Sequence, residues 1–218
     1  MKRIAFYGGS FDPVHNGHLQ IAKKLTEQFG FDEFYFVPAF HAPHKREQTV
    51  SSAFYRYAML ALATNDESNL KISTIELDAP EKPYTIETLT KLKTVYEQSA
   101  RIFFVMGSDS WNEIDTWHKW QELLLITSFV VVTRPNFEIA MAHVTPEIAA
   151  RIVDARGLSS AKILEKLEGG GIFFTDAVQL NVSATTIRRE ISLQTGADWS
   201  KLVPTAVANY IRKYKLYQ

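Results

Sequence analysis

The sequence predicts an α/β fold in which a doubly wound parallel sheet carries helices on both faces, with a small helical part toward the C-terminus. Short apolar runs of strand length alternate with longer segments of helical periodicity. Glycine and proline separate many of these segments, and intervening helices would return the chain for parallel pairing. Because no repeat, low-complexity run or linker interrupts this pattern, we predict a single domain over residues 1–218.

The first half of the chain alternates regularly between the two kinds of element. A strand at 4–7 stops at two glycines, and a helix at 17–29 stops at Gly30, a residue typical of helix ends. A strand at 34–37 is closed by Pro38, and the polar, basic stretch 39–50 reads as a loop. A helix at 52–63, a strand at 70–75 and a helix at 85–96 follow.

The second half continues the alternation less regularly. Apolar strands are expected at 102–106 and 129–133, with a tryptophan-rich helical stretch between them. Residues 137–168 suggest one or two helices, and three glycines at 169–171 form a turn. A strand at 172–175 precedes a helix that opens at Ser183, and Pro204 opens the last helix, which ends near Tyr214.

The composition excludes several classes of protein. Lysine and arginine number 24, as do aspartate and glutamate, so a general nucleic-acid-binding face is not expected. The absence of cysteine excludes disulfides, thiolate metal sites and cysteine nucleophiles. No apolar run approaches the roughly 18 residues of a membrane span, and the N-terminal apolar run is too short for a signal peptide. We therefore expect a cytoplasmic protein with no membrane or nucleic-acid partner.

A glycine turn and two histidines follow the first expected strand. The segment is Gly8-Gly9-Ser10-Phe11-Asp12-Pro13-Val14-His15-Asn16-Gly17-His18. Ligands of parallel sheets lie beyond the carboxyl ends of strands, where the glycines would let a phosphate or adenine approach the backbone. The helix that begins there points its amides at the same place, and both imidazoles could meet one anion. This pattern favours phosphoryl or nucleotidyl transfer. A zinc pair or two capping histidines are the alternatives, although no third zinc ligand lies nearby.

A second candidate anion site lies late in the chain. Ser183 is a good N-cap, which places Thr185 and Thr186 in the first helical turn. Exposed amides and hydroxyls there, with the fixed charge of Arg188, could hold a phosphate. The alternative is an ordinary capped surface helix whose arginine faces solvent.

Together the two motifs resemble those of the nucleotidylyltransferase superfamily. The first matches its Gly-x-Phe-Asp-Pro-x-His-x-Gly-His signature, and the second is similar to Ile-Ser-Ser-Thr-x-Ile-Arg, with departures at Val182 and Ala184. The resemblance implies a Rossmann-like sheet, with His15 and His18 binding the ATP phosphates and stabilising the transition state. The residues expected to bind ATP are Gly8, Gly9, Ser10, Phe11, Gly107, Asp109, Ser183, Thr185 and Arg188.

The middle of the chain resembles one branch of this superfamily, the nicotinate-nucleotide adenylyltransferases. Residues 37–45 are similar to the Pro-x-x-x-Pro-x-His-Lys pattern of that family, and residues 83–89 to its Tyr-Thr-x-Asp-Thr-Leu. Arg56 and Met59 fit an Arg-x-x-Met helix. The resemblance covers residues 1–135 and about 172 to the end. The residues expected to bind the second substrate are His44, Lys45, Arg46, Tyr84, Thr85, Trp117 and Arg134.

Several of these assignments have simple alternatives. The cationic stretch 44–46 would suit phosphates, but it could equally be a solvated loop. Trp117 could stack on a nicotinate ring, whereas Trp111 and Trp120 are expected in the core. The amides near Tyr84 and Thr85 could receive the nicotinate carboxylate. Asp109 could hold a ribose hydroxyl, cap a helix, or do both.

The expected activity follows from these matches. The resemblance implies adenylyl transfer from ATP to nicotinate mononucleotide, giving nicotinate adenine dinucleotide and pyrophosphate in NAD synthesis. The catalytic residues would be His15, His18, Lys45 and Arg188, with Mg²⁺ on the leaving pyrophosphate and no metal ligand from the protein. Nicotinamide mononucleotide or phosphopantetheine as acceptor, or a catalytically silent nucleotide-binding regulator, are the alternatives. A homo-oligomer is compatible with the sequence.

Overall fold

A seven-stranded parallel sheet forms the centre of the computed structural model, which describes residues 1–40, 50–133, 138–178, 182–194, 196 and 198–218. Within those residues the strand order is β3-β2-β1-β4-β5-β7-β6, and every recorded pairing is parallel. The strands are β1 (Lys2–Gly9), β2 (Glu33–Pro38), β3 (Leu70–Ile72), β4 (Ala100–Gly107), β5 (Ser128–Val132), β6 (Ile152–Asp154) and β7 (Ile172–Thr175). The order reverses between β1 and β4, the point at which doubly wound sheets bind ligands.

Both faces of the sheet are apolar. In β1, Ala5 and Tyr7 belong to one core cluster, whereas Ile4 and Phe6 belong to the other. Successive strand residues point to opposite faces, so a strand covered on both sides needs a continuous apolar run. This requirement explains why the first expected strand shows no polar alternation.

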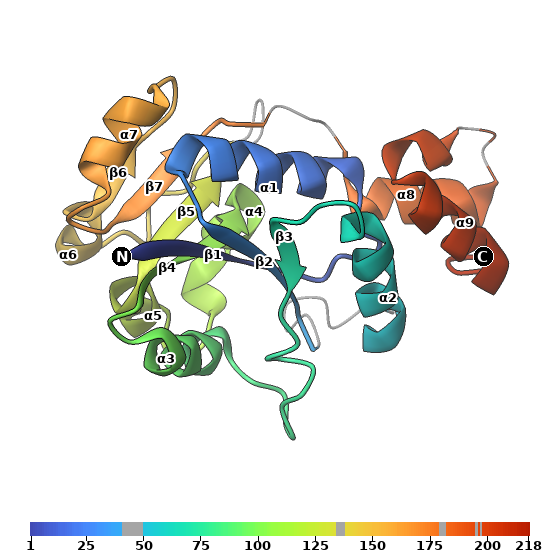
Figure 1. The fold of residues 1–218 in the computed structure, drawn as a ribbon, viewed down its shortest axis with the longest axis horizontal. Helices are drawn as coiled ribbons and strands as arrows, with labels where there is room; N and C mark the ends of the chain where they lie inside the picture. The colour runs from blue at the N-terminus through green and yellow to red at the C-terminus, as the bar shows by residue number, and fades with distance from the viewer. Residues whose placement is uncertain (41–49, 134–137, 179–181, 195, 197) are drawn as a thin grey trace.

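Helices cover the two faces (Figure 1). One face carries α1 (Asn16–Phe29) and α7 (Ser160–Lys166), and the other carries α3 (Thr85–Tyr96), α4 (Ser108–Asn112), α5 (Trp120–Ile126) and α6 (Pro146–Ala149). A short 3₁₀ helix, η1 (Ile114–Thr116), lies between α4 and α5. Helix α1 ends, as expected, at Gly30, whose φ of 60° is left-handed.

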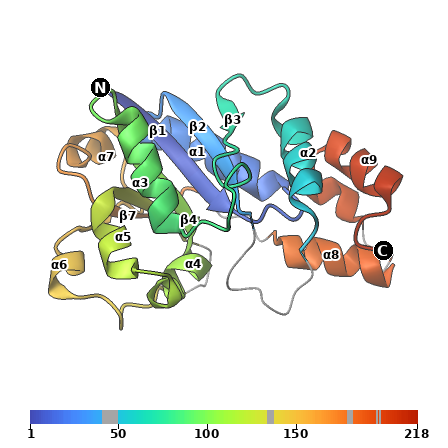
Figure 2. The same cartoon turned by 90° about the horizontal axis from the view of Figure 1, so that it is seen from below.

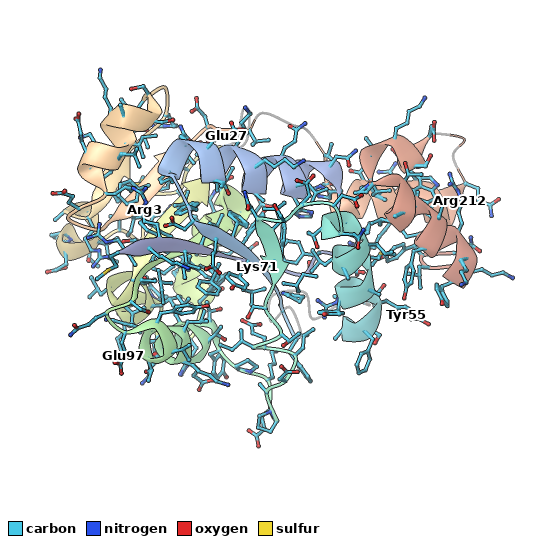
Figure 3. The ribbon with its side chains drawn as sticks, in the orientation of Figure 1. Arg3, Glu27, Tyr55, Lys71, Glu97 and Arg212 are labelled. Atoms are coloured by element: carbon cyan, nitrogen blue, oxygen red, sulfur yellow. The ribbon has the colours of Figure 1, made fainter. Side chains whose placement is uncertain are left out.

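A group of helices lies beyond the carboxyl ends of β1 and β2 (Figures 1 and 2). It consists of α2 (Ala53–Thr64), α8 (Ala184–Leu193), the 3₁₀ helix η2 (Trp199–Leu202) and α9 (Thr205–Tyr214). Figure 3 shows Tyr55 of α2 and Arg212 of α9 at this end of the molecule. The rings of Tyr55 and Tyr214 are 6.0 Å apart, so α2 packs on the predicted C-terminal helical part.

The structure confirms the fold class and most expected elements. The helix at 85–96 and the strand at 172–175 begin and end where predicted. The strand expected at 70–75 was wrong in length, because β3 ends at Ile72. The stretch expected at 137–168 contains two short helices, α6 and α7, as predicted. It also contains the strand β6, which was not predicted because a strand of three residues is too short to show a periodic pattern. Most of the expected loop, residues 41–49, lies outside the described part of the chain.

No helix in the described part of the chain is both long enough and apolar enough to cross a membrane.

Candidate active site

The glycine turn closes β1, and aromatic packing explains both of its glycines. A Cβ on Gly8 would lie 2.5 Å from Cζ of Phe104, and one on Gly9 would lie 2.9 Å from Cζ of Phe11. Phe11 is itself buried, at 2% exposure, and has a φ of 49°, which non-glycine residues rarely adopt. The aromatic side chains therefore shape this turn, and the access of a phosphate to it stays a prediction.

His15 and His18 form a stacked pair at the start of α1. Their ring centroids are 3.6 Å apart and their planes differ by 20°. His15 is 5% exposed and is the N-cap of α1, and its backbone N–H donates to Nδ1 of His18 over 3.2 Å. Because Nδ1 of His18 accepts this bond, the neutral ring carries its proton on Nε2, which makes that atom a donor. The two imidazoles therefore lie side by side and take part in capping α1, while their contact with an anion stays a prediction.

The structure brings the two motifs together. Arg188 donates from one guanidinium nitrogen to the carbonyl oxygen of Asp12 over 2.7 Å and from the other to Oγ1 of Thr185 over 3.3 Å. Ser183 caps α8 as predicted, since its Oγ accepts from the amide of Thr186 over 3.1 Å. The first turn of α8 therefore lies beside the loop that carries the histidines, with a fixed positive charge between them.

Arg56 donates hydrogen bonds to three segments near the histidine pair. Its guanidinium donates to the carbonyl oxygens of Ser10 at 2.9 Å, Ala39 at 2.7 Å and Ser51 at 3.0 Å, and it is 1% exposed. Burial lowers the pKa of Arg56, an effect opposed by the negative charge of Asp12. This arginine thus serves the loop structure around the site.

Glu76 is a half-buried carboxyl beside the residues that follow β2. It accepts from the hydroxyl of Thr88 over 3.1 Å and from the backbone of Phe40. Burial raises the pKa of Glu76 to about 7, although both hydrogen bonds and the nearby Arg56 act in the opposite direction. A carboxyl with this pKa changes its charge in the neutral range.

The expected acceptor side of the site begins at the start of α3. Tyr84 is the N-cap; its amide donates to Oε2 of Glu87 over 2.9 Å, and its carbonyl oxygen accepts from the Glu87 amide over 2.9 Å. The amides of Thr85 and Ile86 precede this first backbone bond of α3. The Tyr84 ring stacks on His118 with centroids 4.2 Å apart. A carboxylate ligand would therefore meet Thr85 before Tyr84.

Three of the four tryptophans lie between β4 and β5, and they differ in their surroundings. Trp111 is fully buried and donates to the carbonyl oxygen of Ala140 over 2.8 Å, which confirms it as a core residue. Trp117 and Trp120 are partly buried and pack on the same core cluster. The core position expected for Trp120 is therefore only partly realised, and contact of Trp117 with a ligand stays a prediction.

The alternative role of Asp109 as a helix N-cap was wrong. Gly107 is the N-cap of α4, and Asp109 lies in the first helical turn. An acidic side chain there interacts favourably with the helix dipole, and both residues lie at the carboxyl end of β4.

Four expected site residues, His44, Lys45, Arg46 and Arg134, lie outside the described residues. Among the residues that are described, no group of three or more histidine, aspartate or glutamate side chains could hold a metal ion.

Sequence reasoning missed three residues around the segment 9–15, which we call the histidine loop. Asp12 is 1% exposed and accepts hydrogen bonds from three distant segments, although it was noticed only as a letter of the signature. Tyr217 is one of its donors, and nothing in the local sequence indicated that contact. Glu76 also escaped notice, because burial of a carboxyl in a loop has no local signature.

Fold and site together define the class. A histidine pair at the topological switch point of a parallel sheet, beside a capped helix with a fixed arginine, fits the nucleotidylyltransferase superfamily that the sequence resembles. The cytidylyltransferase-like family model matches residues 6–190, and the chain belongs to this family.

Relatives that match the whole length of the chain belong to one narrower family within this class. Proteins named "Probable nicotinate-nucleotide adenylyltransferase" include one from Thermoanaerobacter sp. (strain X514), 35% identical over 99% of this chain and 94% of the relative. Another, from Neisseria gonorrhoeae (strain NCCP11945), is 35% identical over 100% of both chains, and one from Pseudomonas aeruginosa (strain UCBPP-PA14) is 36% identical over 100% of this chain and 98% of its own. Within the wider class, the chain therefore belongs to the nicotinate-nucleotide adenylyltransferase family.

Solved structures support the fold. Plasmodium falciparum nicotinic acid mononucleotide adenylyltransferase complexed with NaAD has a TM-score of 0.73 at 20% identity, covering 100% of this chain and 98% of that one. The same enzyme complexed with APC has a TM-score of 0.70, also at 20% identity, with the same coverage.

Proposed function

We propose that the chain transfers the adenylyl group of ATP to nicotinate mononucleotide, giving nicotinate adenine dinucleotide and pyrophosphate in NAD synthesis. The observation that carries the proposal is the stacked His15–His18 pair, tied through Asp12 to Arg188 at the start of α8. The names of the full-length relatives support nicotinate mononucleotide as the acceptor. We place the reaction in the cytoplasm.

In the proposed reaction, a 5′-phosphate oxygen of the acceptor attacks the α-phosphorus of ATP. A new P–O bond forms, the bond from the α-phosphorus to the bridging oxygen breaks, and pyrophosphate leaves with that oxygen. His15, His18 and Arg188 would face the negative charge that spreads over the phosphate oxygens, and Nε2 of His18 would donate a hydrogen bond. Lys45 would add a further charge.

Mg²⁺ enters this proposal as part of the nucleotide substrate, MgATP. It would neutralise charge on the β- and γ-phosphates and on the departing pyrophosphate. The protein's contribution is then to position both substrates in line and to present donors to the developing charge.

The acceptor would bind between α3 and the segment around Trp117. The half-buried indole offers a flat apolar surface for a pyridine ring, and Tyr84 with His118 forms a second aromatic surface. The start of α3 offers amides to a carboxylate, beginning at Thr85. An amide-lined anion site favours nicotinate over the neutral nicotinamide.

A panel of acceptors tests the proposal. ATP with Mg²⁺ is incubated with nicotinate mononucleotide, nicotinamide mononucleotide or phosphopantetheine, and pyrophosphate release is measured. We expect release to be fastest with nicotinate mononucleotide, together with formation of nicotinate adenine dinucleotide. Faster turnover of another acceptor would reassign the substrate, and ATP binding without turnover of any acceptor would indicate a regulator.

A further inference from the structure

Tyr217 contacts the histidine loop, which is far from it in the sequence. Its hydroxyl donates to Oδ1 of Asp12 over 2.6 Å, a contact between residues 205 positions apart. Asp12 is 1% exposed, and its other carboxylate oxygen accepts from the backbone N–H of Ser51 over 3.1 Å. Its carbonyl oxygen accepts from Arg188 over 2.7 Å. One buried residue of the loop is therefore bonded to three segments that are far apart in the sequence.

The chain after α9 turns back so that this contact can form. Lys215 has a φ of 51° and Tyr217 a φ of 67°, both in the left-handed region that non-glycine residues rarely adopt. Between them Leu216 is 9% exposed, and its amide donates to the carbonyl oxygen of Ile211 over 3.1 Å. Such conformations persist where surrounding contacts hold them, and here those contacts direct Tyr217 toward Asp12.

We infer that Tyr217 is a positioning residue for the proposed adenylyl transfer, and that it acts through Asp12 to fix the loop that carries the histidine pair. The inference rests on the proposed function. His15 follows Asp12 by three residues and caps α1, and its amide holds the His18 ring. A shift of Asp12 would therefore move both imidazoles relative to the phosphates.

The hydrogen bond between Tyr217 and Asp12 should be present throughout the neutral pH range. A buried carboxylate is stable only when donors satisfy it, and Tyr217 supplies the shortest of its recorded hydrogen bonds. Burial raises the pKa of Tyr217 well above its usual range, so the hydroxyl keeps its proton at neutral pH. Met59 packs beside it, with its sulfur 4.0 Å from the hydroxyl oxygen.

Substitution of Tyr217 by phenylalanine removes the hydroxyl and keeps the ring. We expect Tyr217→Phe to lower kcat by about tenfold to a hundredfold, with a smaller change in the KM for ATP, because small misplacements of catalytic groups reduce turnover steeply. Tyr214→Phe is the matched control, since Tyr214 is 45% exposed and its ring contacts are with Tyr55 and Tyr210. Melting curves confirm that both variants are folded at the assay temperature. A kcat of Tyr217→Phe within twofold of the control would overturn the inference and leave the contact a purely structural one.

A double-mutant cycle tests the route through Asp12. Asp12→Ala removes both carboxylate oxygens, so if Tyr217 acts through that carboxylate, adding Tyr217→Phe to Asp12→Ala should change kcat by less than twofold. Independent, multiplicative effects would contradict this route.

The histidine C2–H resonances separate this inference from the proposed function. In Tyr217→Phe we expect those of His15 and His18 to shift, while Tyr214→Phe leaves them in place. If the unmodified chain turns over no acceptor, the proposed function fails, and these resonances alone decide the positioning role. Unchanged resonances in Tyr217→Phe would then refute it.

Discussion

Two imidazoles with different surroundings form the centre of the candidate site. His15 is almost fully buried, whereas His18 is partly exposed and is oriented by the His15 amide. This arrangement holds the Nε2 donor of His18 in a fixed direction before any ligand binds. Donors held in place in this way stabilise charge in a transition state without the cost of reorientation.

Replacement of His18 tests that donor. We expect His18→Ala to lower kcat by at least about a hundredfold, as loss of a single transition-state donor does in other enzymes. His18→Asn is the informative companion, because its amide oxygen can still accept from the His15 amide while the imidazole donor is lost. Both variants should melt near the unmodified chain, and full activity in either would remove His18 from the mechanism.

Ionisation of the Glu76 carboxyl should make the stability of the folded chain depend on pH. Burial raises its pKa from 4.5 to about 7 in the folded chain, so the folded state holds a proton that the unfolded state has already released. The free energy of unfolding should therefore fall as pH rises from about 4.5 to about 7, and level off above that range.

The Glu76→Gln variant should lose this dependence. The amide side chain keeps an acceptor for Thr88 and Phe40 but carries no charge, so at pH 8 we expect the variant to be more stable than the unmodified chain by at least about 1 kcal/mol. Urea denaturation at pH 5 and pH 8 measures the difference. Glu165→Gln, at an exposed position on α7, is the control. A Glu76→Gln profile that parallels this control would contradict the burial argument.

At the scale of elements, local sequence was a good guide wherever a cap or a stop residue was present. Ser183 caps α8 and Gly30 ends α1, both as predicted. Ser52, which was expected as the first residue of a helix, is the N-cap of α2. These features depend on contacts within a few residues, so the sequence displays them directly. The three-residue strand β6 has no such marker and becomes a strand only by pairing with β7.

The cap of α8 gives a prediction at this scale. Ser183→Ala should lower the free energy of unfolding by about 1 kcal/mol, because the Thr186 amide loses its acceptor. It should also raise the KM for ATP, since the capped turn faces the histidine loop. Ser159→Ala is the matched control, because Ser159 is the N-cap of α7 without a side-chain hydrogen bond. Equal stability of the two variants would show that the Ser183 bond contributes little.

At the scale of the whole molecule, buried polar side chains hold the loops at the carboxyl edge of the sheet. Arg56, on α2, bonds the loop after β1, the end of β2 and the residues before its own helix. Asp12 does the same for α8 and the segment after α9. The helices that lie beyond the sheet are thereby tied to the loop that carries the histidines.

Replacement of Arg56 should lower the stability of the folded chain. We expect Arg56→Met to lower the free energy of unfolding by about 3 kcal/mol, because several carbonyl oxygens lose a buried donor. Arg56→Lys should recover only part of this loss, since an ammonium group lacks the planar fork. Arg212→Met, which removes an exposed contact with the Trp199 ring, should cost less than about 1 kcal/mol. Similar losses in Arg56→Met and Arg212→Met, measured by denaturant titration, would contradict this account.

The alternation of strands and helices, the two candidate phosphate motifs and most helix ends can be read from the sequence, because each depends on residues that are close along the chain. The tertiary structure alone decided the sheet order and the contacts of Asp12 with Ser51, Arg188 and Tyr217. These contacts join residues up to 205 positions apart, and a local pattern carries no record of which distant donor will fill a buried acceptor.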